Sequence, residues 1–200
     1  MQAVRQFINI FRIPELRRKV FITLGLLALC RLGVFIPLPA IDTAALQEWF
    51  AQAQGGAGGR LLGMVNLFTG GALSKGAIFG LGIMPYISAS IIFQLLANAV
   101  PRLERLRKEG ESGRRKLNQY TRIATVFICL FQGIVFTQGM LAPVMPESAT
   151  ESWFASVTFT LTNGFVLMAG TMFLMWIGEQ IDEHGIGNGI SLIIMTSILS

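Results

Sequence analysis

Charged residues are scarce in this chain of 200 residues. Asp, Glu, Lys and Arg make up 14% of it and hydrophobic residues 52%, whereas about a quarter of the residues in soluble domains are charged. The mean hydropathy is +0.59. This composition excludes an ordinary soluble domain and indicates that lipid is the solvent for much of the chain.

Histidine is nearly absent, which limits metal chemistry. The one histidine, His184, lies among Glu179, Asp182 and Glu183. A metal site rich in histidine is therefore excluded. Carboxylates alone can hold a hard cation, but acidic turns of this kind more often face solvent. We predict a solvated acidic turn and no bound metal.

Cysteines and catalytic motifs are equally sparse. Cys30 and Cys129 lie in apolar runs, which is typical of small buried side chains rather than of a disulfide framework. No G-x-S-x-G sequence occurs, and in "GIGNG" (185–189) the last glycine comes one residue too early for G-x-G-x-x-G. The sequence therefore predicts neither an enzyme nor a bound cofactor.

Basic residues give the chain a formal net charge of +5, but they fall in bands between apolar runs. A nucleic-acid-binding face would gather them on one surface, so no DNA partner is expected. We predict membrane-spanning segments at 20–38, 77–100, 123–141, 153–178 and 189–200. The last segment is shorter than the roughly 20 residues that a span requires, so we expect it to continue beyond Ser200.

A short apolar segment at 61–74 decides the predicted topology. It contains Asn66 and the Gly70–Gly71 pair. The positive-inside rule places both basic bands, one before residue 20 and one at 101–122, in the cytoplasm. They share a side only if segment 61–74 does not cross the bilayer. We therefore predict a re-entrant or buried half-helix and a cytoplasmic N-terminus.

Pro85 stands inside the apolar run 82–96. A proline within a helix removes a hydrogen bond and bends the helix. At membrane depth, broken backbone is tolerated only against protein or a water-filled cavity. We predict a bent helix at Pro85 which, with the glycine-rich linker 55–59 and segment 61–74, forms an irregular hairpin lining a cavity.

Few polar side chains lie inside the predicted spans. Arg31 is the one charge among them, and both a structural anchor and a functional partner remain open for it. Ser90, Gln94 and Asn98 form a polar stripe at helical spacing. Such a stripe is typical of helix packing through hydrogen bonds, and less often marks a path for a polar solute.

Isoleucines recur at a spacing of four residues on two of the predicted helices. One row contains Ile83, Ile87 and Ile91, and the other contains Ile190 and Ile194. Most such rows face lipid or pack against neighbouring helices. The rarer alternative is a hydrophobic pore constriction, and spacing alone leaves both open.

Five blocks of sequence resemble the bacterial SecY family. They are "RLGVFIPLPAID" (31–42), "LFTGGALSKGAIFGLGIMPYISASIIFQLL" (67–96), "RLRKEGESGRRKLNQYTR" (105–122), "GTMFLMWIGEQI" (170–181) and "GIGNGISLII" (185–194). The family usually has glycine where Ala40 stands. The resemblance implies an all-α multi-pass membrane protein, the N-terminal half of a ten-helix inverted-repeat fold whose halves open like a clam shell, with a re-entrant plug.

The resemblance also implies site residues. The pore ring, which seals around a translocating chain, would contain Ile83, Ile87, Ile190 and Ile194. The plug, which closes the channel from outside, would contain Leu61, Leu62, Met64, Val65, Asn66, Leu67, Phe68, Gly70 and Gly71. The lateral gate, through which apolar segments pass into lipid, would contain Pro85, Ser90, Ile91, Gln94 and Asn98.

The basic segment 101–122 has two interpretations. Its charge sets the topology and meets anionic lipid, or it docks on ribosomal RNA or an acidic partner. The docking residues would be Arg105, Arg107, Lys108, Arg114, Arg115 and Lys116.

The function implied by the resemblance is that of the channel-forming subunit of the preprotein translocase in the cell inner membrane. Unfolded secretory polypeptides would cross through it, and transmembrane segments would leave it sideways. Implied partners are SecE, SecG, the SecA motor or a ribosome, and the signal sequences and nascent membrane proteins that it handles. From the residues alone, a secondary transporter with broken helices and a membrane scaffold remain alternatives.

Overall fold

The computed structural model describes residues 14–53, 59–146, 150 and 152–199, and it is all-helical in that part, as predicted. Arg5 and Arg12, two residues of the N-terminal basic band, lie outside the described residues, as do the side chains of Leu61, Arg107 and Arg114. The helices are α2 (Pro14–Gly33), α3 (Thr43–Ala53), α4 (Gly59–Phe68), α5 (Met84–Ala99), α6 (Pro101–Lys108), α7 (Glu111–Gly139), η1 (Ala142–Val144), α9 (Trp153–His184) and α10 (Gly189–Ile198).

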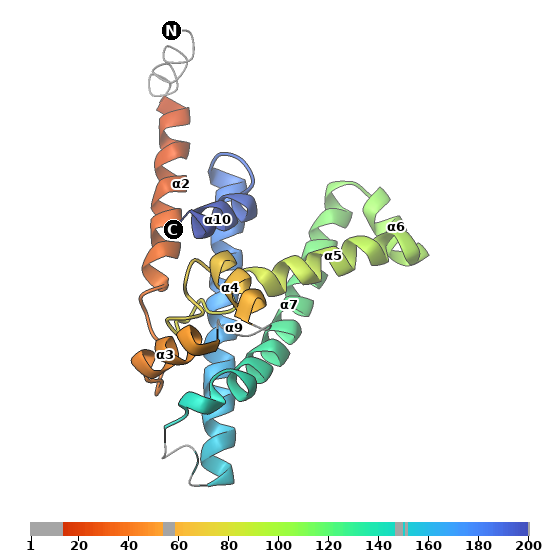
Figure 1. The fold of residues 1–200 in the computed structure, drawn as a ribbon. Coiled ribbons are helices and arrows are strands. Elements are labelled where there is room, and N and C mark those ends of the chain that lie inside the picture. The colour runs from red at the N-terminus through yellow and green to blue at the C-terminus, as the bar shows by residue number, and fades with distance from the viewer. Residues whose placement is uncertain (1–13, 54–58, 147–149, 151, 200) are drawn as a thin grey trace.

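The long helix α9 forms the axis of the molecule (Figure 1). α2 runs beside it, and α7 crosses it in the most extensive helix contact of the described residues. α5 and α6 extend to one side together with the first half of α7, while the short helices α4 and α10 lie near the middle (Figure 1), where α10 contacts α2, α4 and α9. α3 and η1 lie at the end opposite the α9–α10 turn.

The crossing of α7 and α9 depends on two glycines. A Cβ atom on Gly133 would lie 3.1 Å from the Cα atom of Gly164, so the backbones approach as closely as small residues allow. The opposite face of α7 exposes Phe127, Phe131 and Val135. By length and composition, residues 115–139 of α7 and the whole of α9 are apolar enough to cross a membrane.

The first two predicted segments begin or end at other residues than expected. The segment predicted at 20–38 is helical from Pro14 to Gly33 and then turns. A Cβ atom on Gly33 would lie 1.9 Å from the Phe79 ring, so glycine lets the turns before α5 pack closely where the chain leaves the helix. The segment predicted at 77–100 is helical only from Met84, because residues 77–83 form successive turns.

The predicted bend at Pro85 is wrong. Pro85 lies in the first turn of α5, and Ile83 is the residue that caps the helix. The first amides of a helix have no partner within it, so a proline there removes no hydrogen bond. The break in the apolar run lies before the proline, at Gly82, which has φ +58°.

The predicted half-helix is present as α4, and the Gly70–Gly71 pair ends it. These glycines have φ of +63° and +78°, and the Gly71 amide donates to the Asn66 carbonyl oxygen at 2.9 Å. Left-handed glycines that close a helix in this way satisfy its last carbonyl groups. Ala40, where the SecY family usually has glycine, also has a positive φ, of 58°.

Two predicted loops are largely helical. Segment 101–122 forms α6 and the start of α7. The two helices meet closely at Gly113, where a Cβ atom would lie 1.6 Å from the Leu106 carbonyl oxygen. The predicted acidic turn is also mostly helical. α9 continues to His184, so only residues 185–188 form a turn before α10.

Candidate functional site

An apolar cluster joins α2, α5, α9, α10 and the turns before α5. We call it the isoleucine cluster. Its buried members are Cys30, Val34, Ala72, Ala77, Phe79, Ile83, Leu174, Ile177, Ile181 and Ile193, and Ile87, Ile190 and Ile194 pack against it partly buried. The structure therefore brings the four predicted ring residues into one cluster, two from the start of α5 and its cap and two from α10.

The start of α10 is placed by polar contacts and by glycine. The Gly189 amide donates to Asp182 Oδ1 at 2.6 Å, and the Ser191 amide donates to the Asn188 side chain at 3.1 Å. A Cβ atom on Gly189 would lie 2.1 Å from the Gly178 carbonyl oxygen. These contacts fix the direction of α10 and thus bring Ile190 to the cluster.

The end of α4 faces the same cluster. A small cavity of about 30 Å³ lies between them, with Phe68 and Thr69 on one side and Ile83 and Ile193 on the other. A cavity of this size has room for about one water molecule. The predicted plug and the predicted ring therefore adjoin each other.

Asn66 organises the turn that follows α4. Its side-chain Oδ1 accepts from the Ser74 amide at 3.0 Å, and its carbonyl oxygen accepts from Thr69 Oγ1 at 3.0 Å. Four apolar residues of α4, Met64, Val65, Leu67 and Phe68, are exposed. Asn66 thus positions the turn. The exposed face of α4 is not packed against any other part of the described chain.

The predicted gate residues divide into two groups. Pro85 is buried, whereas Ile91, Gln94 and Asn98 are exposed along α5. Gln94 Nε2 donates to Ser90 Oγ at 3.2 Å. The polar stripe therefore lies on an outward face of α5, and Pro85 does not belong to it.

Sequence reasoning did not find the α9 side of the cluster. Leu174, Ile177 and Ile181 lie on one face of α9 and are almost fully buried. Their spacing of three and four residues is the signal that could have identified them. Gly178, which allows α10 to approach, lies on the same stretch.

The basic hairpin of α6 and α7 is exposed. Arg105, Lys108, Arg115 and Lys116 reach solvent, and a hollow of about 620 Å³ is lined by Ser112, Arg115, Lys116 and Gln119. Lys108 also pairs with Glu104 at 2.6 Å within α6. This hairpin concentrates positive charge at the side of the molecule away from α2 (Figure 1).

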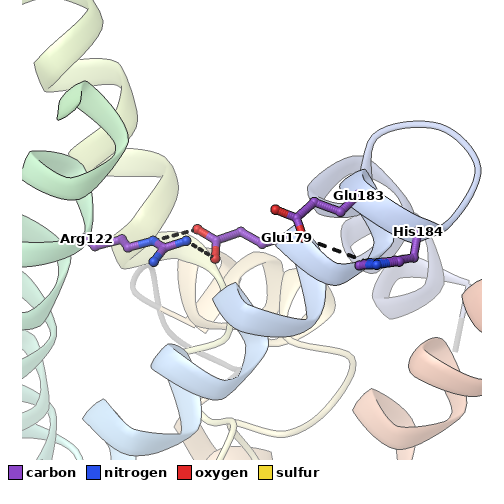
Figure 2. A network of polar contacts seen from close by, with 4 residues as sticks. All are labelled: Arg122, Glu179, Glu183 and His184. Atoms are coloured by element: carbon purple, nitrogen blue, oxygen red, sulfur yellow. Dashed lines mark hydrogen bonds and ion pairs between the residues drawn. The ribbon is translucent and has the colours of Figure 1, made fainter. Parts of the chain in front are cut away.

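Asp182 and Glu183 near the end of α9 are exposed, as predicted for a solvated turn, whereas Glu179 is half-buried and has a partner on another helix. Arg122 of α7 donates from Nε and Nη2 to the two carboxylate oxygens of Glu179, the first at 2.8 Å (Figure 2). Glu183 approaches His184 Nδ1 at 3.9 Å. Within the described residues, no three His, Cys, Asp or Glu side chains are grouped to hold a metal ion.

The Arg122–Glu179 pair is expected to contribute measurably to stability. The side chains are 48% and 24% exposed, so solvent screens the pair and its coupling should be about 1 kcal/mol. A double-mutant cycle of Arg122→Gln and Glu179→Gln, followed by thermal unfolding in detergent, measures it. The exposed Lys108–Glu104 pair is the control, with about 0.3 kcal/mol expected. A coupling no larger than the control would contradict the prediction.

Comparison with known proteins agrees with this geometry. The family model SecY matches residues 77–200, which is more than half of the chain. The chain belongs to the SecY family. It is 48% identical to the protein translocase subunit SecY of Escherichia coli (strain K12) over 186 residues, which is 93% of this chain and 41% of that protein.

Other relatives give the same result. The chain is 44% identical to the protein translocase subunit SecY of Thermus thermophilus over 196 residues, which is 98% of this chain and 44% of that protein. The chain thus spans less than half the length of these SecY relatives. Membership of this family makes it a membrane protein, in agreement with its apolar helices.

Two solved structures share the fold. One is Sec61 in a canine ribosome–channel complex from the endoplasmic reticulum, and the other is described as the structure of a protein-conducting channel. Each has a TM-score of 0.57 and 18% sequence identity over 94% of this chain. The match covers 40% and 39% of those chains and confirms the predicted SecY fold.

Proposed function

We propose that this chain forms one half of a protein-conducting channel, which passes unfolded secretory polypeptides across the cell inner membrane and releases transmembrane segments into lipid. The channel is passive and has no catalytic step of its own. The observation that carries the proposal is the convergence of Ile83, Ile87, Ile190 and Ile194 in one apolar cluster. The family name of the relatives, translocase subunit, is consistent with it.

The seal would be the isoleucine cluster and the plug would be α4. Branched apolar side chains can close around an extended polypeptide without binding any one sequence, and they exclude water when the chain leaves. The end of α4 borders the cluster across a cavity of about 30 Å³. From there α4 would block the path in the resting state.

The outward face of α5 would be one side of the lateral gate. Ser90, Ile91, Gln94 and Asn98 lie on that face, and Ile91 is 51% exposed. Hydrogen bonds between membrane helices contribute about 1 kcal/mol each, so a seam held by such groups can open when an apolar segment enters. Pro85 serves instead to start the helix.

The partners follow from the same proposal. SecE and SecG would complete the complex, and SecA or a ribosome would supply the energy. The exposed cations of the α6–α7 hairpin would meet such a partner or anionic lipid on the cytoplasmic side, together with the N-terminus. Signal sequences and nascent membrane proteins would be the cargo.

A crosslinking experiment tests the proposal. A photoreactive residue is placed at position 83, 87, 190 or 194 of the assembled translocase, and a secretory chain is stalled in transit. We expect crosslinks to the stalled chain from all four positions, because all four face one cluster. Position 127 is the control, because Phe127 is 69% exposed on the outer face of α7.

Two outcomes would contradict the proposal. Equal crosslinking at the four positions and at position 127 would mean that the chain does not pass the cluster. No crosslink at any of the four, while stalled chains span the membrane, would favour a scaffold or a solute transporter instead.

A further inference from the structure

The end of α4 is tied to α2 by one arginine. Arg31 lies half-buried in the last turn of α2, and its Nη1 donates to the Gly70 carbonyl oxygen at 3.3 Å. Gly70 belongs to the turn that ends α4. The carbonyl end of a helix carries partial negative charge, so a guanidinium is well placed there.

Arg31 shares its cavity with a second cation that does not make this contact. The cavity, of about 290 Å³, is lined by Arg31, Lys75, Asn66, Leu67 and Gly70, among others. The Lys75 ammonium lies over the Phe35 ring, 4.5 Å from its centroid. Among the described residues Arg31 makes no ion pair with a carboxylate. No carboxylate there therefore competes with Gly70 for the guanidinium.

α10 closes the other side of this contact. A Cβ atom on Gly70 would lie 3.3 Å from Arg31 Nη1 and 3.3 Å from the Cα and carbonyl oxygen atoms of Ser197. The turn after α4 is therefore held between α2 and α10. The same two helices carry Cys30 and Ile193 of the isoleucine cluster.

We propose that Arg31 is the positioning residue that holds α4 against the isoleucine cluster when the channel is closed. This rests on the proposed function, in which α4 is the plug. A single long hydrogen bond from a charged donor favours the closed state by about tenfold. Such a contact is weak enough for an entering polypeptide to break, and on release both groups regain water.

The test measures the position of α4 directly. Cysteines replace Leu67 and Ile198, which both line the cavity, in assembled translocase whose Cys30 and Cys129 have been changed to alanine. Arg31→Gln is expected to lower the disulfide yield between them several-fold and to raise the resting ion leak of proteoliposomes by about tenfold. Lys75→Gln, which removes the same charge from the same cavity, should change neither, and Arg31→Lys should restore most of the yield.

The inference is overturned if Arg31→Gln and Lys75→Gln give the same yield and the same leak. If Arg31→Gln does not accumulate in the membrane, Arg31→Met keeps the aliphatic stem and supplies both measurements. The disulfide yield reports where α4 lies and needs no cargo. Failure of the proposed function, seen as absent crosslinks to a stalled chain, is therefore distinguishable from failure of this inference.

Discussion

Replacing Gly189 with alanine is expected to push α10 away from α9 and to lower the free energy of unfolding by about 3 kcal/mol, near the upper end for an overpacked contact. The added Cβ atom would lie 2.1 Å from the Gly178 carbonyl oxygen and 2.8 Å from its carbonyl carbon. Both are backbone atoms of a helix, so no side chain can rotate out of the way. The hydrogen bond from the Gly189 amide to Asp182 Oδ1 would lengthen as well.

The displacement should also reach the proposed seal, because Ile190 follows Gly189 directly. Thermal unfolding in detergent measures the loss of stability. Gly25→Ala is the matched control, since nothing lies within 4 Å of a Cβ atom there and alanine in a helix is favoured over glycine by up to about 1 kcal/mol. If Gly189→Ala unfolds at the temperature of the Gly25→Ala variant, the close approach of α9 and α10 is not required.

Replacing Ile83 and Ile87 together with asparagine is expected to make the resting channel leak ions. Ile83 is only 5% exposed in the isoleucine cluster, and Ile87 packs against it. Two amide groups in this place would bind water, so a constriction that excluded water by its apolar lining would become wet. Conductance across a planar bilayer, without cargo, should rise several-fold above that of the unchanged translocase.

A matched pair on another face separates this effect from a general loss of packing. Ile123→Asn with Phe127→Asn has the same spacing, and both side chains are exposed on α7, so this variant should not leak. Burying an amide costs about 1–3 kcal/mol, and this cost lowers the stability of the Ile83 and Ile87 variant. A second double variant, Ile190→Asn with Ile194→Asn, therefore tests the same ring at two positions that are only partly buried. Unaltered conductance in both ring variants would remove these residues from the seal.

The position of Pro85 illustrates where sequence reasoning fell short. A proline in an apolar run has the same composition whether it bends a helix or starts one. What separates the two cases is the backbone before it, where Gly82 has φ +58° and residues 77–83 turn. Those turns are held by contacts with α2 and α9, including the Gly33–Phe79 approach, and no local pattern reports them.

The acidic residues near the end of α9 show the same limit. Glu179 and Asp182 have the sequence neighbours of a solvated turn. Arg122 lies on a different helix, and the crossing of α7 over α9 brings it to Glu179. The pairing of Glu179 with Arg122 therefore has no signal in the local sequence.

The apolar segments, the glycine pair that ends α4 and the all-α class depended on composition and short-range pattern, so the sequence by itself determined them. The helix bounds, the first-turn place of Pro85 and the contact of Arg31 with Gly70 were decided only by tertiary structure. The isoleucine rows depend on both the sequence and the tertiary structure. The sequence determines their spacing, whereas their contact requires α9 to bring α10 to α5. Spacing fixes which face a side chain occupies, and only packing decides what that face meets.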